Sequence, residues 1–224
     1  MSFAYSPKIV TDGLVFAVDA ANTKSYPGSG TTWKDLSGYG NNGTLVNGPI
    51  FDSANGGSIV FDGTNDYVTF NNNNIPNLNT FTDISFCGFF NSNNFSGDRQ
   101  IYSWGANSGL RFRINNGGNS VRFLDRGGTN SPSFNISLNL NTWYFYCTIA
   151  NSNGLTVFIN NVKLSGGSAF NPTLDNNSFY IGTYNTATED MSGKIPNMFI
   201  YNKSLSDSEV TQNYNALKSR FGLT

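Results

Sequence analysis

The side chains best suited to recognising a ligand are arginines, and most of them lie close together in the sequence. Five of the six fall in one stretch: Arg99, Arg111, Arg113, Arg122 and Arg126. Arg111 and Arg113 alternate with apolar residues, so on a strand both point to the same face of a sheet. The Asn/Gly-rich segment 115–119 predicts a turn that brings Arg122 beside them on a partner strand. We therefore expect a cluster of guanidinium groups on one sheet face.

Aromatic residues accompany this arginine cluster. Tyr102 and Trp104 lie just upstream, on what reads as the neighbouring strand, and Tyr144 can join the same surface from a later strand. Planar guanidinium forks beside aromatic rings suit the sulfate, phosphate or carboxylate groups of a glycan. Only Asp98 and Asp125 intervene, so we expect a local positive field that attracts anions. The alternatives are an exposed sheet face whose arginines oppose edge pairing and, for Tyr144, simple core packing.

Residue types that perform catalysis are scarce. The chain has no histidine, two cysteines and only two glutamates, Glu189 and Glu209. Ser-His-Asp and Cys-His sites need an imidazole base, and zinc sites built from His and Cys need more than two ligands. A glycosidase needs two carboxylates flanking the scissile bond. Glu189 and Asp190 are adjacent, would point to opposite faces of a strand, and are expected in a solvated loop. We therefore expect a protein that is not an enzyme.

The segment between Asp62 and Asp66 is the candidate for a metal site. Its carboxylate, hydroxyl and amide oxygens are the ligands that calcium prefers. The same residue types are typical of a hydrogen-bonded turn between two strands, which is the structural alternative.

Cys87 and Cys147 each lie within an apolar run typical of a strand. We expect two buried, reduced thiols. A cross-strand disulfide is the alternative, because the sequence does not give the geometry that such a bond requires.

Charge and hydropathy limit the partners. The formal net charge is −1 and no stretch is apolar enough to span a bilayer, so we expect neither nucleic-acid binding nor membrane insertion. The first ten residues lack the apolar core of a signal peptide, so we expect synthesis in a cytoplasm without secretion.

Short apolar runs separated by Asn/Gly turns predict an all-β, two-sheet antiparallel sandwich. The expected strands are 14–18, 58–61, 67–70, 84–90, 110–114, 121–124, 143–150, 155–159, 162–164, 179–181 and 194–201. Asn160 and Asn161 suit a two-residue hairpin turn, since asparagine tolerates positive φ. We expect residues 1–12 as an N-terminal segment and residues 13–224 as one domain.

One α-helix is expected at the C-terminus, over about 207–220. Ser206 and Glu209 form a capping box, and Val210 and Tyr214 begin an apolar stripe at helical spacing. This helix should pack its apolar stripe onto the sandwich.

Several motifs, taken in order, resemble the laminin G-like, concanavalin A-like lectin/glucanase domains. They are 35–38, 41–44, 61–67, 141–144, 157–161, 180–182 and 193–206, and the resemblance runs from about Gly13 to the C-terminus. It implies a jelly roll whose lectin members bind sugars at the concave face or rim loops. Some members hold structural calcium. Where the family commonly has an acidic pair, this chain has Pro196 and Asn197. If calcium binds, the expected ligands are Asp62, Asp66 and Asn197.

The chain is also similar to proteins of tailed phages, cyanophages especially. This similarity implies a virion surface protein, either a fibre, a decoration protein or an adhesin. Its partners would be other virion proteins or a second copy, and its ligand a host-surface glycan, with an acidic glycan suited to the arginines. The alternatives are a carbohydrate-binding module of a bacterial surface protein and a glycoside hydrolase.

Overall fold

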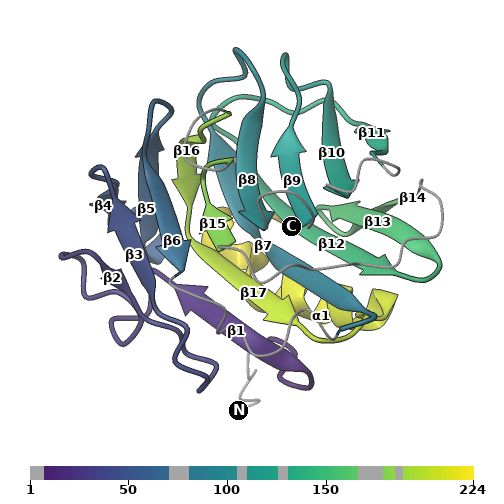
Figure 1. Ribbon diagram of the computed structural model, residues 1–224, viewed down its shortest axis with the longest axis horizontal. Helices are drawn as coiled ribbons and strands as arrows, with labels where there is room; N and C mark the ends of the chain where they lie inside the picture. The colour runs from purple at the N-terminus through teal and green to yellow at the C-terminus, as the bar shows by residue number, and fades with distance from the viewer. Residues whose placement is uncertain (1–7, 71–80, 105–109, 126–130, 166–178, 185–188) are drawn as a thin grey trace.

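Alternating apolar residues fold the chain into two antiparallel β-sheets that pack face to face (Figure 1). The computed structural model describes residues 8–70, 81–104, 110–125, 131–165, 179–184 and 189–224. Within these residues every paired strand is antiparallel, and one α-helix follows the last strand. The predicted jelly-roll sandwich with a C-terminal helix is therefore confirmed.

The first sheet, sheet A, is built around a long central strand, β7 (Ile84–Ser92). One half of β7 pairs with β16 (Ser192–Ile195) and the other half with β17 (Asn197–Tyr201). The remaining strands are β1 (Leu14–Asp19), β4 (Ile50–Asp52), β5 (Ser58–Asp62), β12 (Trp143–Asn151), β13 (Gly154–Ile159) and β14 (Val162–Ser165).

The second sheet, sheet B, has the strand order β11-β10-β9-β8-β15-β6-β3-β2. These strands are β2 (Thr32–Trp33), β3 (Gly43–Val46), β6 (Tyr67–Phe70), β8 (Arg99–Trp104), β9 (Leu110–Ile114), β10 (Ser120–Asp125), β11 (Ser133–Asn135) and β15 (Phe179–Ile181). Strands β2, β3, β4 and β11 are not among those expected from the sequence; each is only two to four residues long.

The main core lies between the two sheets and is rich in aromatic rings. Phe86 of sheet A stacks on Tyr102 of sheet B with ring centroids 4.5 Å apart. Phe112 of sheet B stacks on Tyr146 of sheet A at 5.2 Å. All four side chains are fully buried, so these contacts fix how the sheets lie on one another.

The predicted strand 194–201 is divided in two by Pro196. Proline has no N–H to donate to a neighbouring strand. Instead its carbonyl accepts a hydrogen bond from the N–H of Ala20 at 2.8 Å. The chain shifts at this point from β5 to β1 as its outer partner, while β7 stays its inner partner.

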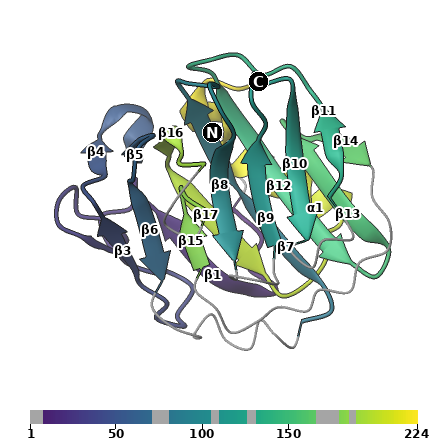
Figure 2. The same ribbon diagram turned by 45° about the horizontal axis from the view of Figure 1, so that its top comes forward.

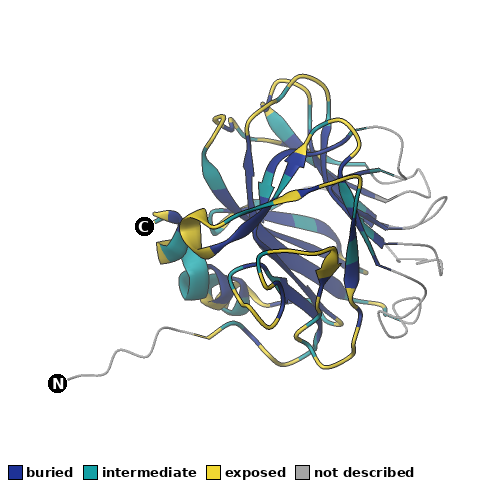
Figure 3. Cartoon of the chain, turned by 90° about the vertical axis from the view of Figure 1, so that its left-hand side faces the viewer, coloured by how far each residue is buried: buried dark blue, intermediate teal, exposed yellow. Residues whose placement is uncertain are grey.

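The helix α1 (Asp207–Leu217) covers the outer side of sheet A (Figure 2). It begins as predicted: Ser206 and Glu209 form a capping box. It continues as a 3₁₀ helix, η3 (Lys218–Phe221), which ends at Gly222 with φ +68°. Its apolar side chains form a second core with sheet A, and Figure 3 shows exposed residues on its outward side. In the described residues, no helix is both long and apolar enough to cross a membrane.

The two cysteines lie opposite one another on β7 and β12, beneath this helix. The structure joins Cys87 and Cys147 in a disulfide. The expectation of two reduced thiols was therefore wrong, and the alternative holds. Strand pairing explains the result, because directly opposed residues of adjacent strands are close enough to bond.

Candidate functional site

Strand register aligns a row of side chains on the outer face of sheet B. Directly opposed residues of an antiparallel pair point to the same side. Tyr180 lies between core residues Phe179 and Ile181, so its side chain points outward. The residues in register with it across neighbouring strands are Thr44, Thr69, Ser103 and Arg111. No helix of the described residues covers this face.

Tyrosine rings accompany the arginine on this face. Tyr67 packs edge-to-face against Tyr180, with ring centroids 5.9 Å apart. The guanidinium of Arg111 lies over the ring of Tyr184, 4.4 Å from its centroid. All four side chains are half-buried, which holds them in place and leaves part of each exposed. We call this surface the tyrosine–arginine face; it comprises Tyr67, Thr69, Tyr180, Tyr184, Arg111, Arg113 and Glu189.

The alternation of Arg111 and Arg113 is confirmed, and their apolar neighbours enter the core as expected. Two acidic groups, however, pair with these arginines. Nη1 of Arg113 lies 2.9 Å from Oδ2 of Asp98 and also bonds Oε1 of Glu189. Nη1 of Arg111 lies 3.6 Å from Oε2 of Glu189. The expected set of nearby acids was therefore incomplete, because Glu189 reaches the cluster from a distant part of the chain.

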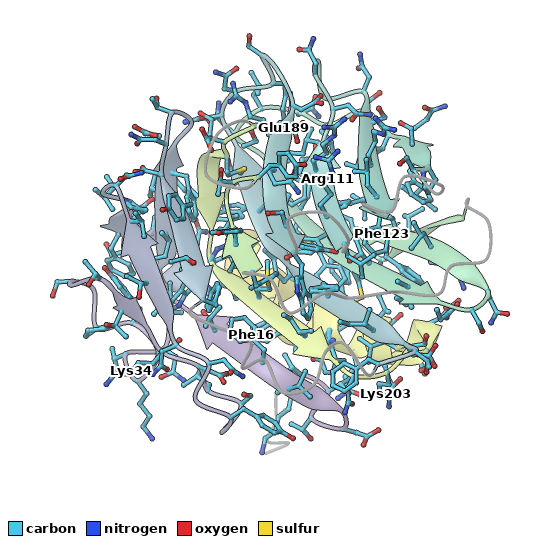
Figure 4. The ribbon with its side chains drawn as sticks, viewed as in Figure 1. Phe16, Lys34, Arg111, Phe123, Glu189 and Lys203 are labelled. Carbon is cyan, nitrogen blue, oxygen red and sulfur yellow. A yellow bond between two sulfur atoms is a disulfide. The ribbon has the colours of Figure 1, made fainter. Side chains whose placement is uncertain are left out.

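Glu189 and Asp190 do not form a solvated loop. Figure 4 shows Glu189 near Arg111 at the upper end of sheet B. The carbonyl of Glu189 accepts a hydrogen bond from the N–H of Gln100 at 2.7 Å. Asp190 is buried and accepts a hydrogen bond from the hydroxyl of Thr183. Burial raises the pKa of the Asp190 carboxyl above its ordinary value.

The other arginines of the stretch have separate roles. Arg99 is buried, and its guanidinium donates to the carbonyls of Asp190 and Ser96. Arg122 lies directly opposite Arg113 and donates to the carbonyl of Ser131 at 3.3 Å. Arg126 lies outside the described residues.

Tyr102, Trp104 and Tyr144 do not belong to this surface, contrary to expectation. All three side chains are buried in the core between the sheets. Strand β8 contains a register shift between Gln100 and Tyr102, which changes the side to which the following residues point. The hydroxyl of Tyr102 hydrogen-bonds the hydroxyl of Thr148, and the hydroxyl of Tyr144 accepts from the N–H of Asn139.

The candidate calcium ligands do not form one site. Asp66 Oδ2 accepts from the N–H of Asp62, and Asp62 Oδ1 accepts from the N–H of Thr64, as in a structural turn. Asn197 lies five residues beyond Ser192, the strand partner of Asp62, which is about 16 Å along an extended chain. Its amide oxygen accepts from the N–H of Phe89. These residues do not fit a shared calcium ion, and no other group of three His, Cys, Asp or Glu side chains in the described residues is placed to hold a metal.

Three tyrosines of the tyrosine–arginine face were not predicted from the sequence: Tyr67, Tyr180 and Tyr184. The pairing of Glu189 with the arginines was not predicted either. Alternation with core residues could have placed Tyr67 and Tyr180 on an outer face. Tyr184 and Glu189 lie outside the strands, where no periodicity indicates which residues they will meet.

The fold agrees with a known family. A family model described as the concanavalin A-like lectin/glucanases superfamily, Laminin_G_3, matches residues 62–211, more than half of the chain. The chain belongs to this superfamily. No curated protein sequence matches it.

Solved structures of the concanavalin A-like fold resemble the chain at low identity. Domain 4 of AbnA, a GH43 extracellular arabinanase from Geobacillus stearothermophilus in complex with arabinotriose, has a TM-score of 0.74 and 15% identity, over 90% of this chain and 98% of that one. The botulinum neurotoxin serotype D/C binding domain has a TM-score of 0.70 and 17% identity, over 92% and 53%.

Larger enzymes also contain this fold. A Trypanosoma rangeli sialidase complex has a TM-score of 0.72 and 17% identity, over 100% of this chain and 36% of that one. The chain thus spans about a third of the length of the sialidases it matches. At such identities the likeness shows the fold alone.

Proposed function

We propose that this domain is a lectin-like module that binds a glycan through the tyrosine–arginine face and does not turn it over. The observation that carries the proposal is the shared row on sheet B. There, half-buried tyrosine rings lie within a few strands of a guanidinium and a carboxylate. Rings provide apolar platforms for sugars, while arginine donates to hydroxyls and the carboxylate accepts from them.

Membership of a superfamily of lectins and glucanases supports the carbohydrate-binding part of this proposal, and so do the neighbours. The AbnA domain was solved with arabinotriose, and the neurotoxin structure is a binding domain. Because folds host many activities, the residues of the face remain the main argument.

A glycan array with the parent protein tests the proposal. We expect binding to at least one glycan and its loss in the Arg111→Ala variant. Lys34→Ala is the matched control, since Lys34 is an exposed cation that Figure 4 places far from Arg111. Binding that survives Arg111→Ala unchanged would place the ligand elsewhere, with the rim loop 35–42 the next candidate.

The absence of turnover is part of the same proposal. Asp98 and Glu189 both contact Nη1 of Arg113, so the two carboxylates are close together, as a retaining glycosidase requires. The guanidinium, however, occupies the space between them, where a scissile bond would have to lie. We expect no reducing-end release from β-glucans, galactans or alginates. Release that disappears in an Asp98→Asn, Glu189→Gln double variant would establish hydrolysis instead.

We further propose that the domain acts on the surface of a tailed-phage virion, in contact with other virion proteins or a second copy. The similarity of the chain to proteins of tailed phages supports this placement. The second candidate is a carbohydrate-binding module of a bacterial surface protein, which the likeness to a domain of an extracellular arabinanase favours. Mass spectrometry of purified virions separates the two: the chain is expected among the virion proteins, and its absence there favours the module.

A further inference from the structure

We infer that the ligand of the tyrosine–arginine face is a neutral sugar chain and that Glu189 determines this specificity. The inference rests on the proposed function, since it names the class of glycan that the same face binds.

The charges of the face favour a neutral ligand. Among the described side chains, Arg111, Arg113 and Arg122 are accompanied by two carboxylates, Asp98 and Glu189. Only Arg122 lacks an acidic partner in that set, and a backbone carbonyl accepts from its guanidinium. Asp98 and Glu189 thus balance the charges of Arg111 and Arg113, and an acidic sugar at these two arginines would also meet the charge of Glu189 itself.

The backbone holds Glu189 in a fixed position. Its carbonyl is held by the N–H of Gln100, and the next residue, Asp190, is buried against Thr183. Its backbone adopts φ +63°, a left-handed conformation that only a small fraction of non-glycine residues take. Because its own carbonyl and the residue after it are anchored, the carboxylate is part of the built surface. A ligand anion would have to displace it from Arg111 and Arg113.

The carboxylate of Glu189 is enclosed beside the guanidinium of Arg111. Its Oε2 atom is buried, has no hydrogen-bond partner among the described residues and lies 3.6 Å from Nη1 of Arg111. Glu189 therefore balances the charge of Arg111 at close range, and a guanidinium balanced in this way suits neutral sugar hydroxyls, which accept from its N–H groups. The edge-packed rings of Tyr67 and Tyr180 supply an uncharged platform on the same face.

The test compares the parent with Glu189→Gln on two sets of probes. Arabinotriose, maltotriose and cellotriose are neutral; sialyllactose and a heparin hexasaccharide are acidic. We expect the parent to bind a neutral probe at least about tenfold more tightly than either acidic probe, with little dependence on salt. Glu189→Gln should lose about tenfold or more on the neutral probe and gain affinity for heparin, with that gain weakening as salt rises.

Two further variants make the result specific. Asp52→Asn removes one negative charge at Lys194 on sheet A and should change neither affinity. Glu189→Asp keeps the charge but withdraws it from Arg111, so it should weaken neutral binding without a gain on heparin. It also keeps the test decisive if Glu189→Gln does not fold.

Other outcomes distinguish a failure of the proposed glycan binding from a failure of the inference about Glu189. If the parent prefers the acidic probes and loses them in Arg111→Ala, the face binds glycans but this inference is wrong. If the Glu189 variants bind both sets as the parent does, Glu189 does not set specificity. If the parent binds no glycan at all, the proposed function fails and the inference with it.

Discussion

Arg113 and Arg122 lie directly opposite one another on β9 and β10, yet their surroundings differ. Arg113 is 8% exposed and bonded to two carboxylates, whereas Arg122 is half-buried and bonded to one carbonyl. We predict that Arg113→Ala lowers the free energy of unfolding by about 1–3 kcal/mol, because it leaves Asp98 and Glu189 without their shared partner. Arg122→Ala should cost less than about 1 kcal/mol. Urea denaturation measures both, and equal losses would contradict the ion-pair network.

The buried carboxyl of Asp66 gives a second prediction, on how the free energy of unfolding depends on pH. Burial raises the pKa of the Asp66 carboxyl above its ordinary value near 3.8, and the nearby charges of Asp62 and Asp190 add to this. The folded state therefore holds this proton more tightly than the unfolded state does, and the stability it contributes falls as pH rises through the raised pKa. Asp66→Asn removes that dependence. The free energy of unfolding of Asp66→Asn, minus that of the parent, should thus increase as pH rises from about 4 to about 7.

Asp52 is the control, because the pKa of its carboxyl is shifted in the opposite direction. The hydrogen bond from Lys194 lowers the pKa of the Asp52 carboxyl. Its contribution is present above the ordinary value and is lost as pH falls through the lowered pKa. Asp52→Asn should therefore be less stable than the parent near neutral pH, with the difference shrinking in acid. Parallel pH profiles for the two variants would refute the assignment.

At the level of elements, the capping box of α1 makes the sharpest prediction. The N–H of Glu209 donates to the hydroxyl of Ser206, and the carboxylate of Glu209 accepts from the N–H of Ser206. Ser206→Ala should cost about 0.5–2 kcal/mol of stability. Ser53 is a matched control, because it precedes the short 3₁₀ helix η1 (Ala54–Gly56) but makes no capping hydrogen bond with its side chain. Thermal unfolding that ranks Ser53→Ala as the costlier change would show that the box does not hold the helix start.

Local chemistry explains which elements were predictable from the sequence. The capping box was readable from two residues, and the hairpin turn at Asn160 and Asn161 has the positive φ values that asparagine tolerates. The side of the sheet to which a strand residue points was harder to predict. Both sides of β12 are buried, one by sheet B and one by α1, so alternation alone could not tell where Tyr144 points.

The candidate site was only partly predictable, for a different reason. The alternation of Arg111 and Arg113 was visible in the sequence, and their common face followed from it. Their partner Glu189 lies 76 residues beyond Arg113, and only the tertiary fold brings it there. The register shift in β8 likewise reversed the expected side of Tyr102, and no turn residue announces it.

On the scale of the whole molecule, the disulfide ties the two central strands of sheet A beneath the helix. It joins residues 60 positions apart, so it restricts the unfolded chain considerably. Reduction should lower the free energy of unfolding by about 2–4 kcal/mol, measured by chemical denaturation with and without dithiothreitol. A Cys87→Ala, Cys147→Ala double variant should not respond to the reductant. A parent whose stability is the same in both conditions would mean that the bond does not form.

Glycan binding through the tyrosine–arginine face is the central claim, and one titration tests it most directly. The best glycan from the array is titrated calorimetrically into the parent, Tyr180→Ala and Tyr39→Ala. Tyr39 is 56% exposed and lies in the rim loop 35–42, outside the strands that form the row of Tyr180. We predict that Tyr180→Ala weakens binding about tenfold or more while Tyr39→Ala binds as the parent does. Loss of binding in Tyr39→Ala with full binding in Tyr180→Ala would contradict the account and assign the site to the rim loop.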